Sequence, residues 1–275
     1  MPPPPFWPKP NRFRVALHNG GPPPVAMWIT LQSANVVELV GAQGVDTVIL
    51  DLEHTSSTPA DLQPLIVAAQ LAGMTALVRP AGLDPHEIGR LLDAGVQGIV
   101  FPMVSSAVEG AAAARAVGYP PAGSRGWAGA HARHVRWTGT RPDGDDYRLL
   151  SPEFLAAANE SVATVFMIEN RAGVDQLEDI LDAGAPDAVI FGWADFTVDA
   201  GFDTARVAAA RERVYSTCRK RGIGVAISVV PRDKVEYYPG CFFSAGVDAT
   251  IASEAVGARL SEVRAAIAGS AGAGQ

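Results

Sequence analysis

The segment "VDTVILDLEH", residues 45–54, decides how this chain is read, because it joins a short apolar run to three ionisable side chains. The run is rich in β-branched residues and predicts a buried β-strand. Asp51, Glu53 and His54 then follow where the strand should reach the surface. Several ionisable side chains at the end of a buried strand indicate a functional site there.

Seven further runs of this kind are found, and segments with helical spacing and much alanine lie between them. The runs cover residues 25–30, 74–80, 98–104, 163–170, 186–196, 224–230 and 248–253, and the helical segments cover 59–73, 85–95, 107–118, 173–184 and 205–222. Several helical segments end in glycine, which suits a left-handed cap. Eight strands alternating with helices predict an α/β fold, a single-domain (β/α)8 TIM barrel. A doubly wound sheet is the competitor, but no glycine-rich dinucleotide fingerprint follows the first strand.

Composition restricts the class of protein. The chain has 275 residues, 48% of them hydrophobic, and a net charge of −7. A large core is therefore possible, whereas a main role in nucleic-acid binding is disfavoured because it needs a basic face. No apolar run approaches the ~20 residues of a membrane-spanning helix. We expect a flexible proline-rich tail over 1–12, the barrel over 13–268 and a flexible tail over 269–275. Without an export signal, Cys218 and Cys241 are expected to be reduced thiols in a cytoplasmic protein.

Polar side chains cluster at the carboxyl ends of the predicted strands, where TIM barrels carry their active sites. Besides the three residues after the second strand, Arg79 ends the third, Glu169 and Asn170 end the fifth, and Asp195 ends the sixth. Glu169 and Asp195 come from adjacent parallel strands, which lie about 4.8 Å apart. Two carboxylates so close repel each other unless a cation joins them, and Mg²⁺ or Mn²⁺ needs only one or two protein carboxylates.

Each of these groups also has a structural explanation. Glu169 could form a buried ion pair with Arg79, and Asp195 could cap a helix. His54 could be a hydrogen-bonded strand-end residue, and Asp51 could hold a loop. Two loops stay open as well: "PPAGSRGW", residues 120–127, is an anion-binding turn or an ordinary loop, and residues 133–150 are a lid or a solvated loop.

Six motifs taken together resemble, in order and spacing, those of the HpcH/HpaI family of metal-dependent pyruvate aldolases. They are "LDLEHT" (50–55), "VRP" (78–80), "RLLDAGVQGIVFPMV" (90–104), "YPPAGSRG" (119–126), "VFMIEN" (165–170) and "FGWADFT" (191–197). The resemblance implies a class II aldolase or retro-aldolase that acts on 2-oxo-4-hydroxy acids through a pyruvate enolate. Oxaloacetate decarboxylation, or chemistry like that of macrophomate synthase, is the alternative within this class. A barrel that binds a ligand without turnover is the alternative outside it.

The resemblance also implies roles for single residues. Glu169 and Asp195 match the two metal ligands, for Mg²⁺, Mn²⁺ or Co²⁺, and Arg79 matches the arginine that contacts the keto oxygen of pyruvate. Asp51 and His54 match a dyad for proton transfer, in which Asp51 orients His54. Glu53 is given no role in the chemistry.

The remaining implied roles concern the substrate and the assembly. Backbone amides near Ala194 and Asp195 would hold the pyruvate carboxylate, and the aldehyde is the second substrate. Asp93 matches an acidic residue that reaches a neighbouring subunit's site. Helices at the C-terminus, with an apolar stripe at Val256, Leu260, Val263 and Ile267, would be exchanged between subunits of a homo-oligomer, a hexamer built as a trimer of dimers.

Three departures from the family pattern bear on the aldehyde acceptor. Trp193 stands where the family shows proline, beside the pyruvate carboxylate pocket. Met167 stands where many members carry glutamine. The segment 141–147 looks longer than usual.

Overall fold

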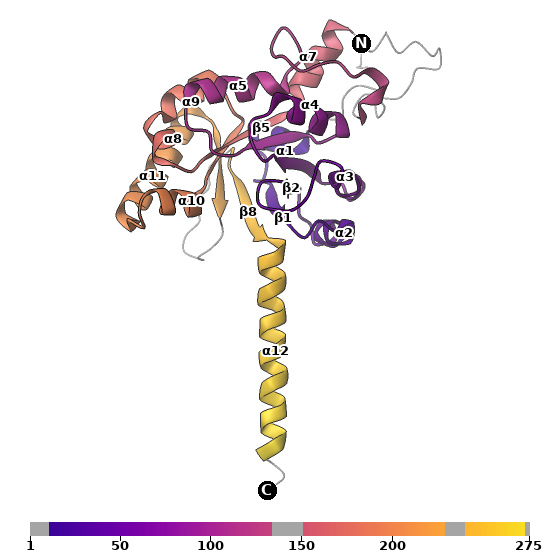
Figure 1. The fold of residues 1–275 in the computed structure, drawn as a ribbon, viewed down its shortest axis with the longest axis vertical. Coiled ribbons are helices and arrows are strands. Elements are labelled where there is room, and N and C mark those ends of the chain that lie inside the picture. Colours follow the sequence, from indigo (N-terminus) through magenta and orange to yellow (C-terminus); the bar gives the residue numbers. More distant parts are fainter. Residues whose placement is uncertain (1–10, 134–150, 229–239, 273–275) are drawn as a thin grey trace.

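Eight parallel strands close into a barrel in which each strand pairs with the next along the chain and β8 pairs with β1 (Figure 1). The computed structural model describes residues 11–133, 151–228 and 240–272. The strands are β1 Val25–Ile29, β2 Thr47–Asp51, β3 Thr75–Arg79, β4 Gly98–Phe101, β5 Ala163–Ile168, β6 Ala188–Phe191, β7 Gly224–Ser228 and β8 Phe242–Val247. The predicted (β/α)8 fold and its single domain are confirmed.

Helices on the outside of the barrel connect these strands. They are α2 Ala34–Ala42, α3 Leu62–Leu71, α4 Pro85–Ala94, α5 Ala107–Val117, α7 Pro152–Glu160, α8 Arg171–Asp175, α9 Leu177–Gly184, α10 Trp193–Asp199 and α11 Thr204–Arg221, with a 3-10 turn, η1, at Gly129–His131. The predicted helical segment 173–184 is divided into two helices at Gln176. Gly95 and Gly222 adopt left-handed conformations at the ends of α4 and α11, as the sequence predicts for such caps.

The prediction of the eighth strand was wrong. Residues 248–253 begin a helix, α12 Asp248–Gly272, and the strand is the preceding segment 242–247. Phe242 and Phe243 have the stronger β-propensity and pair with β7 and β1. Asp248 ends the strand because its carboxylate accepts hydrogen bonds from the amides of Thr30 and Leu31. The sixth predicted run is also shorter than expected, since the strand ends at Phe191 and α10 begins at Trp193.

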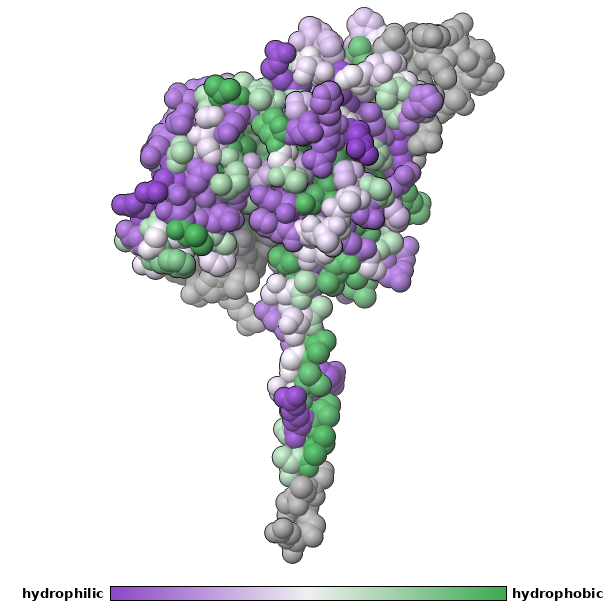
Figure 2. All heavy atoms as spheres, in the orientation of Figure 1, coloured by the Kyte–Doolittle hydropathy of each residue, from purple (hydrophilic) through white to green (hydrophobic). Residues whose placement is uncertain are grey.

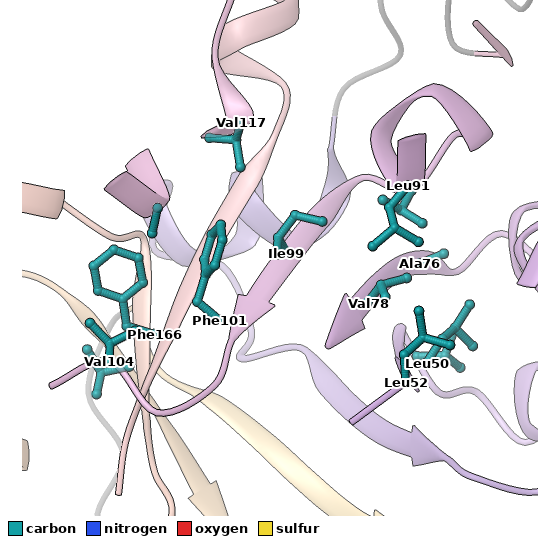
Figure 3. Packing of buried hydrophobic residues seen from close by; sticks show 14 of the residues in the cluster. Leu50, Leu52, Ala76, Val78, Leu91, Ile99, Phe101, Val104, Val117 and Phe166 are labelled. Atoms are coloured by element: carbon teal, nitrogen blue, oxygen red, sulfur yellow. The ribbon is translucent and has the colours of Figure 1, made fainter. Parts of the chain in front are cut away.

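The strands divide the core into two layers. Ile49, Leu77 and Val100 belong to the inner layer, whose side chains fill the barrel. The alternate residues of the strands form the outer layer, where they pack against the helices (Figure 3). Val78, Ile99, Phe101 and Phe166 belong to it. Both faces of each strand are thus covered, which explains why the strands read as continuous apolar runs. The same alternation decides which strand-end residues point into the barrel mouth.

An N-terminal helix, α1 Arg12–His18, lies against the amino-terminal end of the barrel. Phe13 and Leu17 are buried with the inner layer, and the ring of Phe13 packs edge-on against Phe242 at 5.1 Å. Arg14 and His18 both contact Asp187, at 2.8 and 2.7 Å. The folded part therefore begins before residue 13. Residues 1–10 of the predicted tail lie outside the described residues.

The C-terminal helix α12 projects away from the barrel instead of packing on it (Figure 1). Its described side chains are exposed along the helix, and Figure 2 shows hydrophobic residues running down one of its sides. The helix continues to Gly272, so part of the predicted tail 269–275 is helical. Within the described residues, no helix combines the length and hydropathy that crossing a lipid bilayer requires.

Candidate active site

The carboxyl ends of β2 and β3 place Asp51 directly beside Arg79 at the barrel mouth, as the strand register requires. The Nε and Nη2 atoms of Arg79 donate hydrogen bonds to the two carboxylate oxygens of Asp51, both at 2.8 Å. Both side chains are buried. The guanidinium also lies over the indole ring of Trp28, 4.6 Å from its centroid. Two rigid contacts therefore fix the orientation of Arg79.

Burial acts to lower the pKa of Arg79, but the hydrogen bonds and charge of Asp51, with the charge of Glu53, raise it above the usual value. The guanidinium is therefore a permanent positive charge inside the mouth. Among the described residues, no hydrogen bond joins Asp51 to His54. The structure brings Asp51 to Arg79 and not to the imidazole, so the expected dyad of Asp51 and His54 is not formed here.

His54 lies at the edge of the site. Its side chain is 61% exposed, and its Nε2 atom is 3.8 Å from a carboxylate oxygen of Glu53. The imidazole is thus free to turn toward a substrate above the mouth. Its acidic neighbour is therefore Glu53, for which no role in the chemistry was predicted, instead of Asp51.

Glu53 is the site residue that the sequence reading missed. Its Oε2 atom lies 3.1 Å from Nη1 of Arg79, and its side chain is only 16% exposed. Burial raises the pKa of Glu53; Arg79 and His54 act to lower it, while Asp51 and Asp195 raise it further. β2 ends at Asp51, so strand alternation covers Ile49 and Asp51 but does not reach Glu53, whose contact with Arg79 depends on the bend that follows the strand.

Glu169, which follows β5, is a buried carboxylate with one oxygen unused. The residue is 2% exposed. Its Oε1 atom accepts a hydrogen bond of 2.7 Å from the amide of Met103, whose φ of 55° is unusual for a residue other than glycine. Its Oε2 atom is buried and accepts no hydrogen bond from the described residues. An unpaired buried carboxylate oxygen is costly, so the arrangement indicates a missing partner.

Burial raises the pKa of Glu169 to about 7; the Met103 amide opposes this, and the charges of Asp195 and Glu53 add to it. Gly192 permits the close approach of the next strand. A Cβ atom at this position would lie 2.3 Å from Oε2 of Glu169, too close for any other residue. A glycine is therefore required where β6 passes the carboxylate.

Asp195 lies in the first turn of α10, which follows β6. It is exposed, and it interacts electrostatically with Glu53 and Glu169. Neither structural explanation from the sequence describes the pair. Asp195 is not the cap of α10, since the N-cap residue is Gly192, and Arg79 forms its ion pairs with Asp51 and Glu53 instead of Glu169.

These residues fit a divalent cation bound by hard oxygen ligands. Arg79 is shared by Asp51 and Glu53, and among the described residues Glu169 and Asp195 form no ion pair of their own at the mouth. Within the described part of the chain, no three acidic, histidine or cysteine side chains are arranged to hold a metal by themselves. Glu169 and Asp195 would therefore supply two ligands, and substrate oxygens and water would complete the coordination of Mg²⁺, Mn²⁺ or Co²⁺.

Trp193 and Ala194, the residues expected near the substrate carboxylate, are both exposed at the start of α10. The indole of Trp193 is 63% exposed and borders the mouth next to Asp195. On β5, the strand next to β6, the Sδ atom of Met167 lies 3.9 Å from Nη1 of Arg79. The departures from the family pattern at these two positions thus lie at the site itself.

Asp93 lies elsewhere. It is near the C-terminal end of α4, which leads to the amino-terminal end of β4, and its carboxylate accepts a hydrogen bond of 2.7 Å from Arg125. The guanidinium of Arg125 also stacks on Tyr119 at 4.6 Å. Since Arg125 is held by these contacts, the segment 120–127 is better described as a structural loop than as an anion site. Residues 134–150, most of the possible lid, lie outside the described residues.

Comparisons with known proteins identify the family and support the fold. The profile of the HpcH/HpaI aldolase/citrate lyase family matches residues 25–253. A 4-hydroxy-2-oxo-heptane-1,7-dioate aldolase of Shigella sonnei is 34% identical over 263 residues, which cover 91% of this chain and 95% of the relative. An HpcH/HpaI aldolase/citrate lyase family protein of Burkholderia cenocepacia superposes with a TM-score of 0.81 at 26% identity, over 92% of this chain and 99% of the other. Macrophomate synthase shares the fold, with a TM-score of 0.77 at 24% identity over 95% and 91% of the two chains.

Proposed function

The chain belongs to the HpcH/HpaI aldolase/citrate lyase family, and from that premise we propose that it is a carbon–carbon lyase, a class II aldolase for 2-oxo-4-hydroxy acids. One observation carries the proposal: Glu169 keeps a buried, unpaired carboxylate oxygen beside Asp195, in the same mouth as the fixed cation of Arg79. The name of the Shigella sonnei relative, whose substrate is a 2-oxo-4-hydroxy acid, supports the substrate class.

A divalent cation held by Glu169 and Asp195 would supply Lewis acidity toward the two oxygens of a 2-oxo carboxylate. Arg79 is suited to the charge that develops on the keto oxygen when an enolate forms. Asp51 occupies its Nε and Nη2 atoms, and Nη1 lies 3.1 Å from Oε2 of Glu53, on the side of the guanidinium that would share its charge with the keto oxygen. Because Asp51 and Trp28 hold the guanidinium in place, it needs no reorientation when this charge appears.

His54 is the candidate for proton transfer, because it is the exposed base at the rim. In the cleavage direction the hydroxyl on C4 loses its proton, the C3–C4 bond breaks to release an aldehyde, and its electron pair forms the pyruvate enolate. C3 of the enolate then takes a proton to give pyruvate. The backbone amides of Ala194 and Asp195 would hold the carboxylate, and Trp193 would border the aldehyde.

The proposal predicts that the protein exchanges the methyl protons of pyruvate for deuterium in heavy water. This test needs no knowledge of the aldehyde. EDTA should abolish the exchange, and Mn²⁺, Mg²⁺ or Co²⁺ should restore it. Proton NMR of the methyl signal gives the rate. Pyruvate binding without exchange in the presence of every one of these ions would favour a non-catalytic barrel, and exchange that survives EDTA would indicate a mechanism without a metal.

The assembly is proposed from α12. Val256, Leu260, Val263 and Ile267 lie on one side of the helix and are 47–64% exposed. Fully burying such a side chain stabilises a protein by roughly 1.5–3 kcal/mol. In a single chain the projecting helix does not gain this stabilisation. We therefore propose that α12 packs on another copy of the chain in a homo-oligomer, a trimer of dimers. Asp93, on the barrel surface, is the candidate for a contact between subunits.

Light scattering at micromolar concentration is expected to show an oligomer. Leu260→Glu combined with Val263→Glu should shift the mass toward the monomer, because it places two charges in the apolar stripe. Ser261→Glu is the matched control, since this position is exposed on another side of α12. A monomeric wild-type protein would contradict both the exchange of helices and any contact of Asp93 between subunits.

A further inference from the structure

Glu53 brings a second carboxylate to the guanidinium of Arg79 in the barrel mouth. The guanidinium of Arg79 already has a full counter-charge in Asp51, which accepts two of its hydrogen bonds at 2.8 Å. Glu53 places a second carboxylate 3.1 Å from the same guanidinium, through an Oε2 atom that is buried and accepts no well-aligned hydrogen bond from the described residues. One cation therefore faces two carboxylates, and an ion pair alone does not explain the second.

A second unpaired oxygen lies across the barrel lumen. Glu169 follows β5 and Glu53 follows β2, and the inward faces of these strands meet in the same mouth. Electrostatic coupling links Glu53 to both Glu169 and Asp195. Two buried carboxylate oxygens that accept no well-aligned hydrogen bond from the described residues, one of them 3.1 Å from Nη1 of Arg79, thus follow different strands of the same barrel mouth. A positive charge placed there would compensate both of them.

We propose that Glu53 is the third carboxylate of the cation site: it faces the hydration shell of a cation held by Glu169 and Asp195 and tightens its binding. The inference rests on the proposed function for the cation itself. Asp51 and Glu53 then have separate roles, since Asp51 orients Arg79 and Glu53 strengthens the binding of the cation. Carboxylates in this outer position change metal affinity by about 10–100-fold when they are removed.

The test measures the affinity of the full-length chain for Mn²⁺ alone, by calorimetry after EDTA treatment and dialysis. Glu53→Gln keeps the shape of the side chain and removes its charge, so it should weaken Mn²⁺ binding about 10–100-fold. Glu53→Asp keeps the charge on a shorter arm and should recover part of the loss. Arg79 retains its two bonds to Asp51 in both variants, and circular dichroism melting curves should confirm that they fold.

The matched control is Asp199→Asn. Asp199 ends α10, the helix that carries Asp195, but its carboxylate is bonded to Arg171. If Asp199→Asn weakened Mn²⁺ binding as much as Glu53→Gln, the effect would be one of overall charge and the proposal would be overturned. Wild-type affinity in Glu53→Gln, with affinity lost in Glu169→Gln, would overturn it while leaving the cation site intact. A wild-type chain that binds no Mn²⁺ would overturn both this inference and the metal-dependent function.

Discussion

Replacing Glu169 by glutamine is expected to weaken divalent-cation binding roughly a hundredfold or more, and Asp195→Asn is expected to do the same, because each removes one of the two proposed direct protein ligands. The amide keeps the size of the Glu169 side chain, and its oxygen can still accept the hydrogen bond from Met103. The fold should therefore survive. Deuterium exchange into pyruvate should disappear together with the cation.

Calorimetry with Mn²⁺ and Mg²⁺ gives the affinities, and Glu109→Gln is the matched control. Glu109 lies in the first turn of α5, where it accepts a hydrogen bond from the amide of Ser105 and is exposed. Its replacement removes the same charge on the same side of the barrel without touching the site. Unchanged affinity in both Glu169→Gln and Asp195→Asn would show that the cation is bound elsewhere.

The raised pKa of Glu169 gives this result a pH dependence. Since that pKa is about 7 without a cation, a proton competes with the metal below neutral pH. Each unit below a pKa costs about a factor of ten, so affinity should fall about tenfold between pH 8 and 6. In the metal-free protein, the raised pKa of Glu169 makes the folding stability decrease as pH rises, whereas an ordinary paired carboxylate makes it increase. The contribution of Glu169 to stability is present at low pH and is lost as pH rises through about 7. Adding the cation should restore the lost stability.

Strands were predicted correctly where a local sequence pattern determines them, and incorrectly where a contact distant in sequence does. Seven of the eight predicted strands coincide with strands, because strands covered on both faces are continuous apolar runs that periodicity detects. The eighth prediction, "DATIAS", failed for a tertiary reason: Asp248 accepts hydrogen bonds from the amides of Thr30 and Leu31, 218 and 217 residues away, and no local pattern records that.

For the site residues, too, positions at strand ends could be predicted from the sequence, whereas contacts between strands could not. Arg79, Glu169 and Asp195 were identified from their positions at strand ends, and the structure brings them to one mouth. The pairing of Asp51 depends on the register of β2 against β3, which places it opposite Arg79, and the sequence alone does not give that register. The same holds for Glu53, which lies two residues beyond the end of β2: its contact with Arg79 depends on the bend after the strand, and strand alternation does not determine that bend.

Arg79→Ala is expected to have two separable effects, because Arg79 both faces the reacting oxygen and neutralises Asp51. Loss of the contact to the developing enolate charge should slow deuterium exchange by about 10²–10³-fold, as removal of an oxyanion donor does. Asp51, which is 1% exposed, would be left buried without a counter-charge. Removing one partner of such a pair typically costs about 3–5 kcal/mol of folding free energy. The variant should therefore be both slow and unstable in urea.

A second variant separates the two effects. Asp51→Ala combined with Arg79→Ala removes both members of the fully buried pair, so only the partly exposed Glu53 loses a counter-charge and much of the stability should return. The exchange rate should stay low, because no cation then faces the keto oxygen. Arg79→Lys provides the complementary test, since it keeps the positive charge but cannot form two parallel bonds to Asp51. Exchange at the wild-type rate in the double variant would mean that Arg79 holds the mouth together without taking part in the reaction.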